Sequence, residues 1–320
     1  MILLEHGPEG RPAIFDTPDE IVTAHHPDEV APALARLDAL RGQGAWVAGY
    51  LSYEAGYALE PKLAPFMPEG RAHPLLAFGA YAAPKAVHEI TALPGFGGQT
   101  VHEITAKTHL SPLRPMVSRA AYDAAMDRVK SYIAAGDCYQ INLTFPMQAD
   151  LTGDAYGLYL ALRARQAVGY GVLIDLGVGP QIVSRSPELF FSVTNQGRIE
   201  SRPMKGTAPR SPDPEEDAAL AQDLWRSEKG RAENLMIVDL LRNDISRIAR
   251  IGSVKVPELY AVESFATVHQ MSSRVIGQLV DPPSLSRLMP ALFPCGSITG
   301  APKIRAMQII REVEPFPRGV

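Results

Sequence analysis

The stretch SRPMKGTAPR, residues 201–210, is the part of the sequence from which we interpret the fold. It follows a strand-like run, and its prolines predict a rigid turn. Gly206 lets the backbone approach a ligand closely because it has no side chain. Thr207 adds a hydroxyl group, and Lys205 supplies either a positive charge for an anion or, when neutral, a nucleophilic amine. A surface loop with one solvated lysine is the alternative, so the role of this stretch depends on its surroundings.

The composition describes an ordinary globular chain. Of its 320 residues, 46% are hydrophobic and 21% are charged, and the formal net charge is -4. This charge gives no reason to expect a nucleic acid or a membrane surface as a partner. Because there are only two cysteines, Cys138 and Cys295, no disulfide framework is expected and a cytoplasmic location fits. The longest apolar stretch, residues 170–178, is too short to span a bilayer.

Changes in composition divide the chain into three expected parts. Residues 1–82 contain two strand-like runs and one amphipathic helix at 28–41, with apolar positions at Val30, Leu34, Leu37 and Leu40, which predict a small N-terminal αβ portion. Residues 83–117 are rich in Pro, Gly and Thr, which is typical of a linker or a peripheral hairpin. The sequence VHEITA occurs twice there, at 87–92 and 101–106. Two strands around a turn explain this repeat, and so does chance duplication. Residues 118–320 are expected to form the main domain.

Within residues 118–320, Ser118 predicts the N-cap of a helix that ends near residue 135. The alternating residues 138–145 predict a strand whose amide-rich face, which includes Gln140, is either solvated or lines a polar cavity. Because the remaining strands cluster and the helices cluster without regular alternation, the pattern favours an α+β fold with largely antiparallel sheets. Further helices are expected at 154–167, 214–228 and 230–250 and after residue 284, and further strands near 170–194 and 253–280.

Two other side chains are candidates for catalysis. Glu188 lies between a turn and an apolar strand, and a carboxyl group beside an apolar surface tends to have a raised pKa and can act as a general acid. A solvated glutamate at the start of a strand is the alternative. His269 lies within an expected strand, where a single histidine is more often structural than catalytic. Both hypotheses stay open for each residue.

Glu233 is the candidate metal ligand. At about 100° per residue along a helix, it lies on the same side as Met236, Ile237 and Leu240. An acid on a core-facing stripe costs free energy unless a cation or a metal ion pairs with it. An internal salt bridge explains the position as well as a metal ion does.

A loop of small residues leads into a helix within residues 293–307. Such loops expose N–H groups that suit a carboxylate or a phosphate. The loop does not match a P-loop, because Pro302 separates the glycine from the lysine.

Taken together and in this order, the motifs resemble those of the chorismate-utilising enzymes. The resemblance is strong over residues 118–320, and GYLSYEA at 49–55 is similar to the N-terminal part of the aminodeoxychorismate synthase branch. It implies a fold like that of anthranilate synthase component I, in which antiparallel sheets pack as a sandwich with helices on the outer faces. The matching segments are GDCYQINLT at 136–144, SPELF at 186–190, RPMKGT at 202–207, and residues 232–244 and 296–307.

Within that family, Lys205 indicates the branch. Anthranilate synthase large subunits typically carry alanine at this position, whereas aminodeoxychorismate synthases carry lysine. Isochorismate and salicylate synthases carry a lysine at the position of Gln140. The resemblance therefore implies a transferase that aminates chorismate at C4 with ammonia from a glutaminase partner, on the route to 4-aminobenzoate and folate. Anthranilate synthase component I and a non-catalytic fragment that only docks a glutaminase subunit are the alternatives.

The resemblance also implies roles for the reacting groups. Mg²⁺ held by Glu233 would bind the ring carboxylate of chorismate. Lys205, which must be neutral and therefore needs burial or a nearby cation, would attack ring carbon C2 while Glu188 protonates the departing 4-hydroxyl. Ammonia would then add at C4 and expel the lysine.

The remaining implied roles concern binding. Gly206, Thr207 and Gln140 would hold the substrate, and His269 is counted among the catalytic residues. Family members continue beyond the position of Val320. We therefore expect the second metal-binding glutamate and a substrate-binding arginine to lie outside this sequence.

Overall fold

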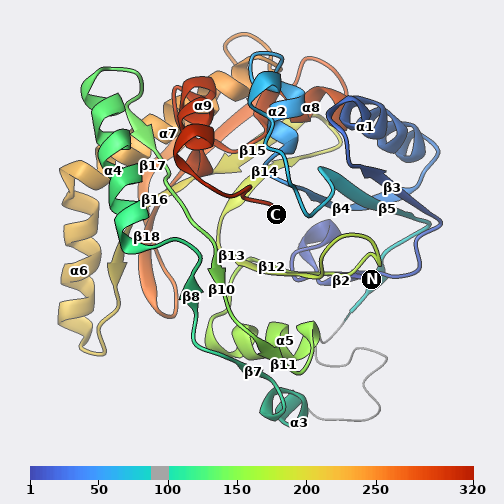
Figure 1. Cartoon of the computed structure of the whole chain (residues 1–320), viewed down its shortest axis with the longest axis horizontal. Coiled ribbons are helices and arrows are strands. Elements are labelled where there is room, and N and C mark those ends of the chain that lie inside the picture. Colours follow the sequence, from blue (N-terminus) through green and yellow to red (C-terminus); the bar gives the residue numbers. More distant parts are fainter. Residues whose placement is uncertain (88–100) are drawn as a thin grey trace. The chain divides into compact units, whose positions relative to one another are not determined.

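The structure is a computed structural model that describes residues 1–87 and 101–320 (Figure 1). Contacts divide the chain into two compact units. The first comprises Met1–Asp123, Thr144–Pro187 and Glu314–Val320, and the second comprises Ala124–Leu143 and Glu188–Val313. These units differ from the three consecutive parts expected from composition, because the chain returns to the first unit twice. Composition along a chain does not reveal such returns.

Two antiparallel sheets form the framework of the first unit. The strand orders are β13-β12-β1-β2-β6 and β3-β5-β4. Ile2 pairs with Ile174 across β1 and β12, so residues near the N-terminus hold strands that follow residue 170. The strands are β1 (Ile2–Leu4), β2 (Ala13–Phe15), β3 (Glu20–Ala24), β4 (Trp46–Leu51), β5 (Leu76–Tyr81), β6 (Lys85–Ala86), β12 (Tyr170–Ile174) and β13 (Ile182–Ser186).

The helices of the first unit bury one face each. Helix α1 (Pro27–Gly42) buries Val30, Leu34, Leu37 and Leu40, as their spacing predicts. Helix α5 (Ala155–Arg165) packs against β12 and β13 and begins at Asp154, whose side chain accepts the N–H of Gly157. The other elements are α2 (Ala55–Leu59), α3 (Val101–Ala106), two 3₁₀ turns (Pro8–Gly10, Ala64–Phe66), and the pairs β7 (His109–Leu110) with β11 (Leu151–Thr152) and β8 (Arg114–Pro115) with β10 (Met147–Gln148).

The expected hairpin within residues 83–117 falls partly outside the described residues, since residues 88–100 carry most of the first VHEITA copy. The second copy forms helix α3 and not a strand. The explanation of the repeat as two strands around a turn therefore does not hold for the second copy.

The second unit is built on one five-stranded antiparallel sheet. Its order is β14-β15-β18-β16, and β17 also pairs with β18. Helix α7 (Glu228–Ser246) packs against β16 and β18 (Figure 1). Its Ile237 and Leu241 form a buried core with Ile199 and Val275. The strands are β14 (Leu189–Val193), β15 (Arg198–Arg202), β16 (Met204–Pro209), β17 (Lys255–Ser264) and β18 (Val268–Gln278).

The other helices of the second unit agree closely with the expected ranges. The Ser118 hydroxyl accepts the N–H of Ala121 at the start of α4, so the predicted N-cap is confirmed. Residues 119–123 of this helix fall in the first unit. The elements are α4 (Arg119–Ala134), α6 (Pro214–Arg226), α8 (Leu285–Leu292), α9 (Lys303–Val313), the 3₁₀ turn η4 (Gly296–Ile298), and the short strands β9 (Gln140–Ile141) and β19 (Gly300–Ala301).

The turn expected at residues 201–210 is wrong. Only Pro203 separates β15 from β16, and β16 pairs antiparallel with β18. The register shifts between Met204 and Thr207, so Lys205 and Gly206 lie at an irregularity of the β-bulge type. Gly206 has a φ of +96°, a left-handed conformation that glycine adopts readily. The strand pairing with β18 therefore overrides the local preference of the prolines.

The strand expected at residues 138–145 is largely wrong as well. Only Gln140 and Ile141 form a strand, because their partner β19 is itself two residues long. The expected fold class is confirmed: helices are combined with antiparallel sheets. Among the described residues, no helix has the length and apolar character that crossing a membrane requires.

Candidate active site

Lys205 lies in strand β16 of the second unit's sheet and not on a solvated loop. Its side chain starts at the irregularity in β16 and is half-buried. The Lys205 Nζ donates a hydrogen bond to the carbonyl oxygen of Ser297 at 2.9 Å. This bond joins residues that are far apart in the sequence and fixes the position of the amine.

Glu188 lies beside this lysine, immediately before β14. Its Oε1 accepts the Ser297 hydroxyl at 2.5 Å and the N–H of Met204 at 3.4 Å. Burial raises the pKa of the Glu188 carboxyl, and the bond from Ser297, the bond from Met204 and the charge of Lys205 offset part of that rise. The direction of the pKa shift agrees with the expectation for a general acid.

Gln140 lies beside the loop of residues 293–302, which carries Ser297. Strand β19 pairs with β9, so that Ala301 lies opposite Gln140. A Cβ atom at Gly300 would lie 2.1 Å from the backbone oxygen of Gln140, which only glycine avoids. In the described part of the chain, the buried side-chain oxygen Oε1 of Gln140 has no hydrogen-bond partner. An orphaned buried acceptor of this kind is suited to a ligand or a water molecule.

Glu233 projects from the first half of α7 and is only half-buried. Its Oε1 lies 3.9 Å from Nζ of Lys229, one turn earlier, and the Lys229 side chain is 87% exposed. Within residues 1–87 and 101–320, no group of three or more His, Cys, Asp and Glu side chains could hold a metal ion. The described residues thus supply one carboxylate toward Mg²⁺ and no complete ligand set. The pair with Lys229 lies at the protein surface, so it is a weak ion pair and not the internal salt bridge that was the alternative.

His269 and Thr207 have partners of their own. His269 is 1% exposed, and its ring nitrogens lie 2.9 Å from Oδ1 of Asp217 and 2.8 Å from Oγ of Ser264. These contacts favour the structural alternative for His269. Thr207 is exposed, and its hydroxyl donates to Oε1 of Gln270 at 3.2 Å.

Three residues of this region were not predicted as functional. Ser297 contacts both Lys205 and Glu188, and the buried Asp244 pairs with Lys303 at 2.5 Å. The small-residue loop was predicted to expose free N–H groups and belongs to a segment that matches the family, but no role was predicted for the Ser297 side chain. Nothing in the local sequence of Ser297 indicates that its hydroxyl meets a side chain 109 positions earlier.

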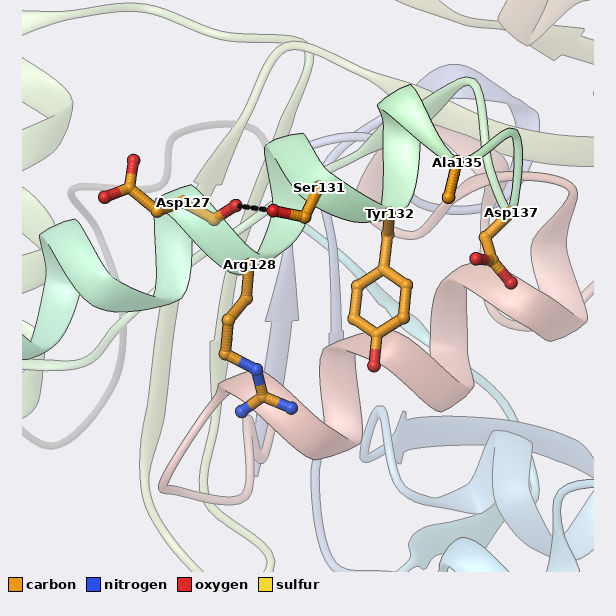
Figure 2. A pocket seen from close by; sticks show the side chains of 6 residues that line it. All are labelled: Asp127, Arg128, Ser131, Tyr132, Ala135 and Asp137. Atoms are coloured by element: carbon orange, nitrogen blue, oxygen red, sulfur yellow. Dashed lines mark hydrogen bonds between the residues drawn. The ribbon is translucent and has the colours of Figure 1, made fainter.

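A pocket of about 460 Å³ lies along α4 (Figure 2). Arg128 and Tyr132 project from α4 in the same direction, and both bind Glu312 of α9. The Tyr132 hydroxyl lies 2.5 Å from Oε2 of Glu312. None of the predicted site residues lines this pocket, which is formed by Asp127, Arg128, Ser131, Tyr132, Ala135 and Asp137.

Comparison with protein families gives one match over nearly the whole chain. The family described as "chorismate binding enzyme" matches residues 2–320. The chain is 48% identical over 202 residues to aminodeoxychorismate synthase component 1 of Escherichia coli (strain K12), which is 63% of this chain and 44% of that protein. It is 38% identical over 232 residues to the protein of the same name from Bacillus subtilis (strain 168), which is 72% of this chain and 48% of that protein.

Another relative carries a different name. The chain is 38% identical over 238 residues to anthranilate synthase component 1 of Streptomyces coelicolor, which is 74% of this chain and 46% of that protein. The chain thus spans about half the length of the curated relatives that it matches.

Solved structures share the fold at lower sequence identity. Anthranilate synthase component I from Streptococcus pneumoniae superposes with a TM-score of 0.76 at 24% identity, covering 100% of this chain and 78% of that one. A putative isochorismate synthase from Bacillus anthracis superposes with a TM-score of 0.72 at 20% identity, covering 99% of this chain and 78% of that one.

Proposed function

Since the chain belongs to the chorismate-binding enzymes, we propose that it carries the amination of chorismate at C4, which yields 4-amino-4-deoxychorismate for 4-aminobenzoate and folate synthesis. One observation supports this reaction above the others: a lysine amine and a carboxyl group of raised pKa are held by the same residue, Ser297. A nucleophile next to a general acid is the pair that displacement of a hydroxyl group requires.

The two groups divide the proposed reaction between them. The neutral Lys205 amine adds to C2, the ring double bond shifts, and the C4 hydroxyl leaves as water with the proton of Glu188. Ammonia then adds at C4 as an ammonium group, the double bond shifts back, and Lys205 leaves C2 as a free amine. The extra proton on the new nitrogen returns to the Glu188 carboxylate. Chorismate and ammonia are consumed, and aminodeoxychorismate and water are formed. The raised pKa keeps the Glu188 proton available nearer neutral pH than that of an ordinary glutamate.

Substrate binding would use the residues around this pair. The orphaned Gln140 oxygen can accept a hydrogen bond from a substrate hydroxyl. Gly206 lies next to Lys205 in the strand irregularity, where its backbone could approach the substrate, whereas Thr207 would have to exchange its bond to Gln270. His269 could act directly only by giving up a bond to Asp217 or Ser264.

Mg²⁺ is part of the proposal, although Glu233 alone does not make a metal site. Mg²⁺ is commonly bound by one or two carboxylates together with oxygens of the substrate and of water. The ion would offset the negative charge of the chorismate carboxylate when bound. The steps above depend only on Lys205 and Glu188.

The proposal includes a partner and a location. The ammonia would come from a partner subunit, a glutamine amidotransferase, and the name component 1 of the relatives supports the existence of a second component. Cys138 and Cys295 are both free thiols, which fits the reducing cytoplasm.

Identification of the product tests this function. Chorismate, Mg²⁺ and ammonium are added to the protein, and the products are separated by chromatography. We expect 4-amino-4-deoxychorismate and no release of pyruvate. Anthranilate with stoichiometric pyruvate would contradict the proposal and support the activity named for the Streptomyces coelicolor relative. Binding of a glutaminase without any binding of chorismate would support a docking fragment instead.

The Glu233→Gln substitution tests the metal role. We expect the Mg²⁺ concentration required for half-maximal chorismate binding to rise about tenfold or more, because an amide is a poorer ligand than a carboxylate. Calorimetric titration of Mg²⁺ in the presence of chorismate measures this without turnover. Asp239→Asn on the same helix is the control, because Asp239 is exposed and paired with Arg242. Equal Mg²⁺ affinity in both variants would remove Glu233 from the metal site.

A further inference from the structure

Ser297 contacts both of the proposed reacting groups with different atoms. Its carbonyl oxygen accepts the Lys205 amine at 2.9 Å, and its hydroxyl donates to the Glu188 carboxyl at 2.5 Å. Ser297 itself is 5% exposed, so water does not compete effectively for these bonds. One buried residue therefore sets where the amine and the carboxyl group lie relative to each other.

A second contact fixes the direction of the Ser297 hydroxyl. Sγ of Cys295 lies 3.1 Å from Oγ of Ser297. Since a hydroxyl has one hydrogen and Ser297 uses it on Glu188, the Cys295 thiol must be the donor. Burial raises the pKa of this thiol to about 11, so the thiol keeps its hydrogen at neutral pH. The donors therefore run in one direction, from Cys295 to Ser297 to Glu188.

The loop that carries these residues is held on its inner side by α7. A Cβ atom at Gly296 would lie 2.3 Å from a methyl carbon of Leu240. The Thr299 hydroxyl closes the loop on itself, since its single hydrogen is shared between the carbonyl oxygens of Cys295 and Gly296, at 3.2 and 3.3 Å. Ser297 thus projects from a segment with little freedom to move.

From these contacts we propose that Ser297 is a positioning residue, which orients the Glu188 carboxyl through its hydroxyl while its carbonyl oxygen holds the Lys205 amine. This inference rests on the proposed function, in which Glu188 protonates the leaving hydroxyl group. Replacement of the side chain removes only the first contact, because the carbonyl oxygen belongs to the backbone. The hydroxyl and carbonyl contributions can therefore be separated.

The Ser297→Ala substitution tests the inference through the pH dependence of the reaction. Glu188 acts in its protonated form, so the rate falls as the pH rises through its pKa. The Ser297 hydroxyl favours the ionised form, and its loss raises that pKa further. We expect kcat to fall about tenfold or more, KM to change little, and the alkaline limb of the kcat profile to move to higher pH.

Two further variants separate orientation from general damage. Ser297→Thr keeps a hydroxyl and is expected to restore the position of the alkaline limb. Thr299→Val removes hydrogen bonds from the same loop that do not reach Glu188, and should leave the limb in place even if stability falls. A limb that moves equally in the Thr299 and Ser297→Ala variants would overturn the inference.

A measurement without turnover keeps the two hypotheses apart. The Glu188 carboxyl is titrated by carbon NMR in the wild type and in Ser297→Ala, with Glu188→Gln to assign the signal. A raised pKa in Ser297→Ala supports the positioning role even if no aminodeoxychorismate is formed, which would refute only the proposed function. Unchanged titration would overturn the positioning role whatever the product is. In addition, Ser297→Ala should cause no further loss of rate in a Glu188→Gln background.

Discussion

Lys205→Ala should lower the rate of aminodeoxychorismate formation by roughly 10³-fold or more, because the variant lacks the nucleophile that carries the covalent step. The half-buried amine, which donates to Ser297 beside the Glu188 carboxyl, has no substitute in this position once the side chain ends at Cβ.

Lys205→Arg distinguishes covalent chemistry from charge. Arginine keeps a positive charge and N–H donors for Ser297, but it stays protonated and cannot attack carbon. We expect this variant to bind chorismate and to be nearly as inactive as Lys205→Ala. The control is Lys255→Ala, which removes an exposed lysine outside the candidate site and should leave the rate unchanged.

Mass spectrometry of the protein quenched during turnover measures the covalent step directly. A mass increase on wild-type protein that is missing in both Lys205 variants is the expected result. A rate near that of wild type in Lys205→Ala would rule out the covalent route. The position of Glu188 would then need another explanation, such as acid catalysis of direct attack by ammonia.

Lys303→Met should lower the free energy of unfolding of the second unit by about 3–5 kcal/mol, since it leaves the Asp244 carboxylate buried without its cation. The two side chains are 15% and 7% exposed, and Lys303 Nζ lies 2.5 Å from Asp244 and 2.9 Å from the carbonyl oxygen of Leu292. This pair joins α7 to the start of α9 and so fixes one end of the loop that carries Ser297.

The pH dependence of that loss has a defined sign. Burial raises the pKa of Asp244, and the Lys303 charge opposes the rise. Without Lys303 the folded-state pKa rises further, so the folded variant takes up a proton more readily than the unfolded chain. The deficit in stability should therefore be largest at neutral pH and should shrink as the pH falls toward that raised pKa.

The sequence offers a matched control and a reporter for this experiment. Arg242→Met breaks the exposed pair with Asp239 on the same helix and should change stability by less than about 1 kcal/mol. The chain has two tryptophans, and Trp46→Phe leaves Trp225 as a fluorescence reporter of the second unit. Equal urea midpoints for Lys303→Met and Arg242→Met would show that the buried pair of Asp244 and Lys303 adds nothing to the free energy of unfolding. Asp244→Leu combined with Lys303→Met should recover much of the loss.

The sequence by itself determined the features that depend on neighbours along the chain. The spacing of Val30, Leu34 and Leu37 gave α1, the Ser118 cap gave the start of α4, and the order of motifs gave the family. The direction of the Glu188 pKa shift was also predictable, because the apolar strand that follows it lies in the same short segment.

Only the tertiary structure decided how the candidate site is assembled. Strand β18 draws residues 204–209 into the sheet against their local turn preference, and β1 draws residues 170–174 into the first unit. Ser297 meets Lys205 and Glu188 across separations of 92 and 109 residues. Contacts over such separations depend on strand register and buried packing, whose free energies exceed local preferences and leave no periodic pattern in the sequence.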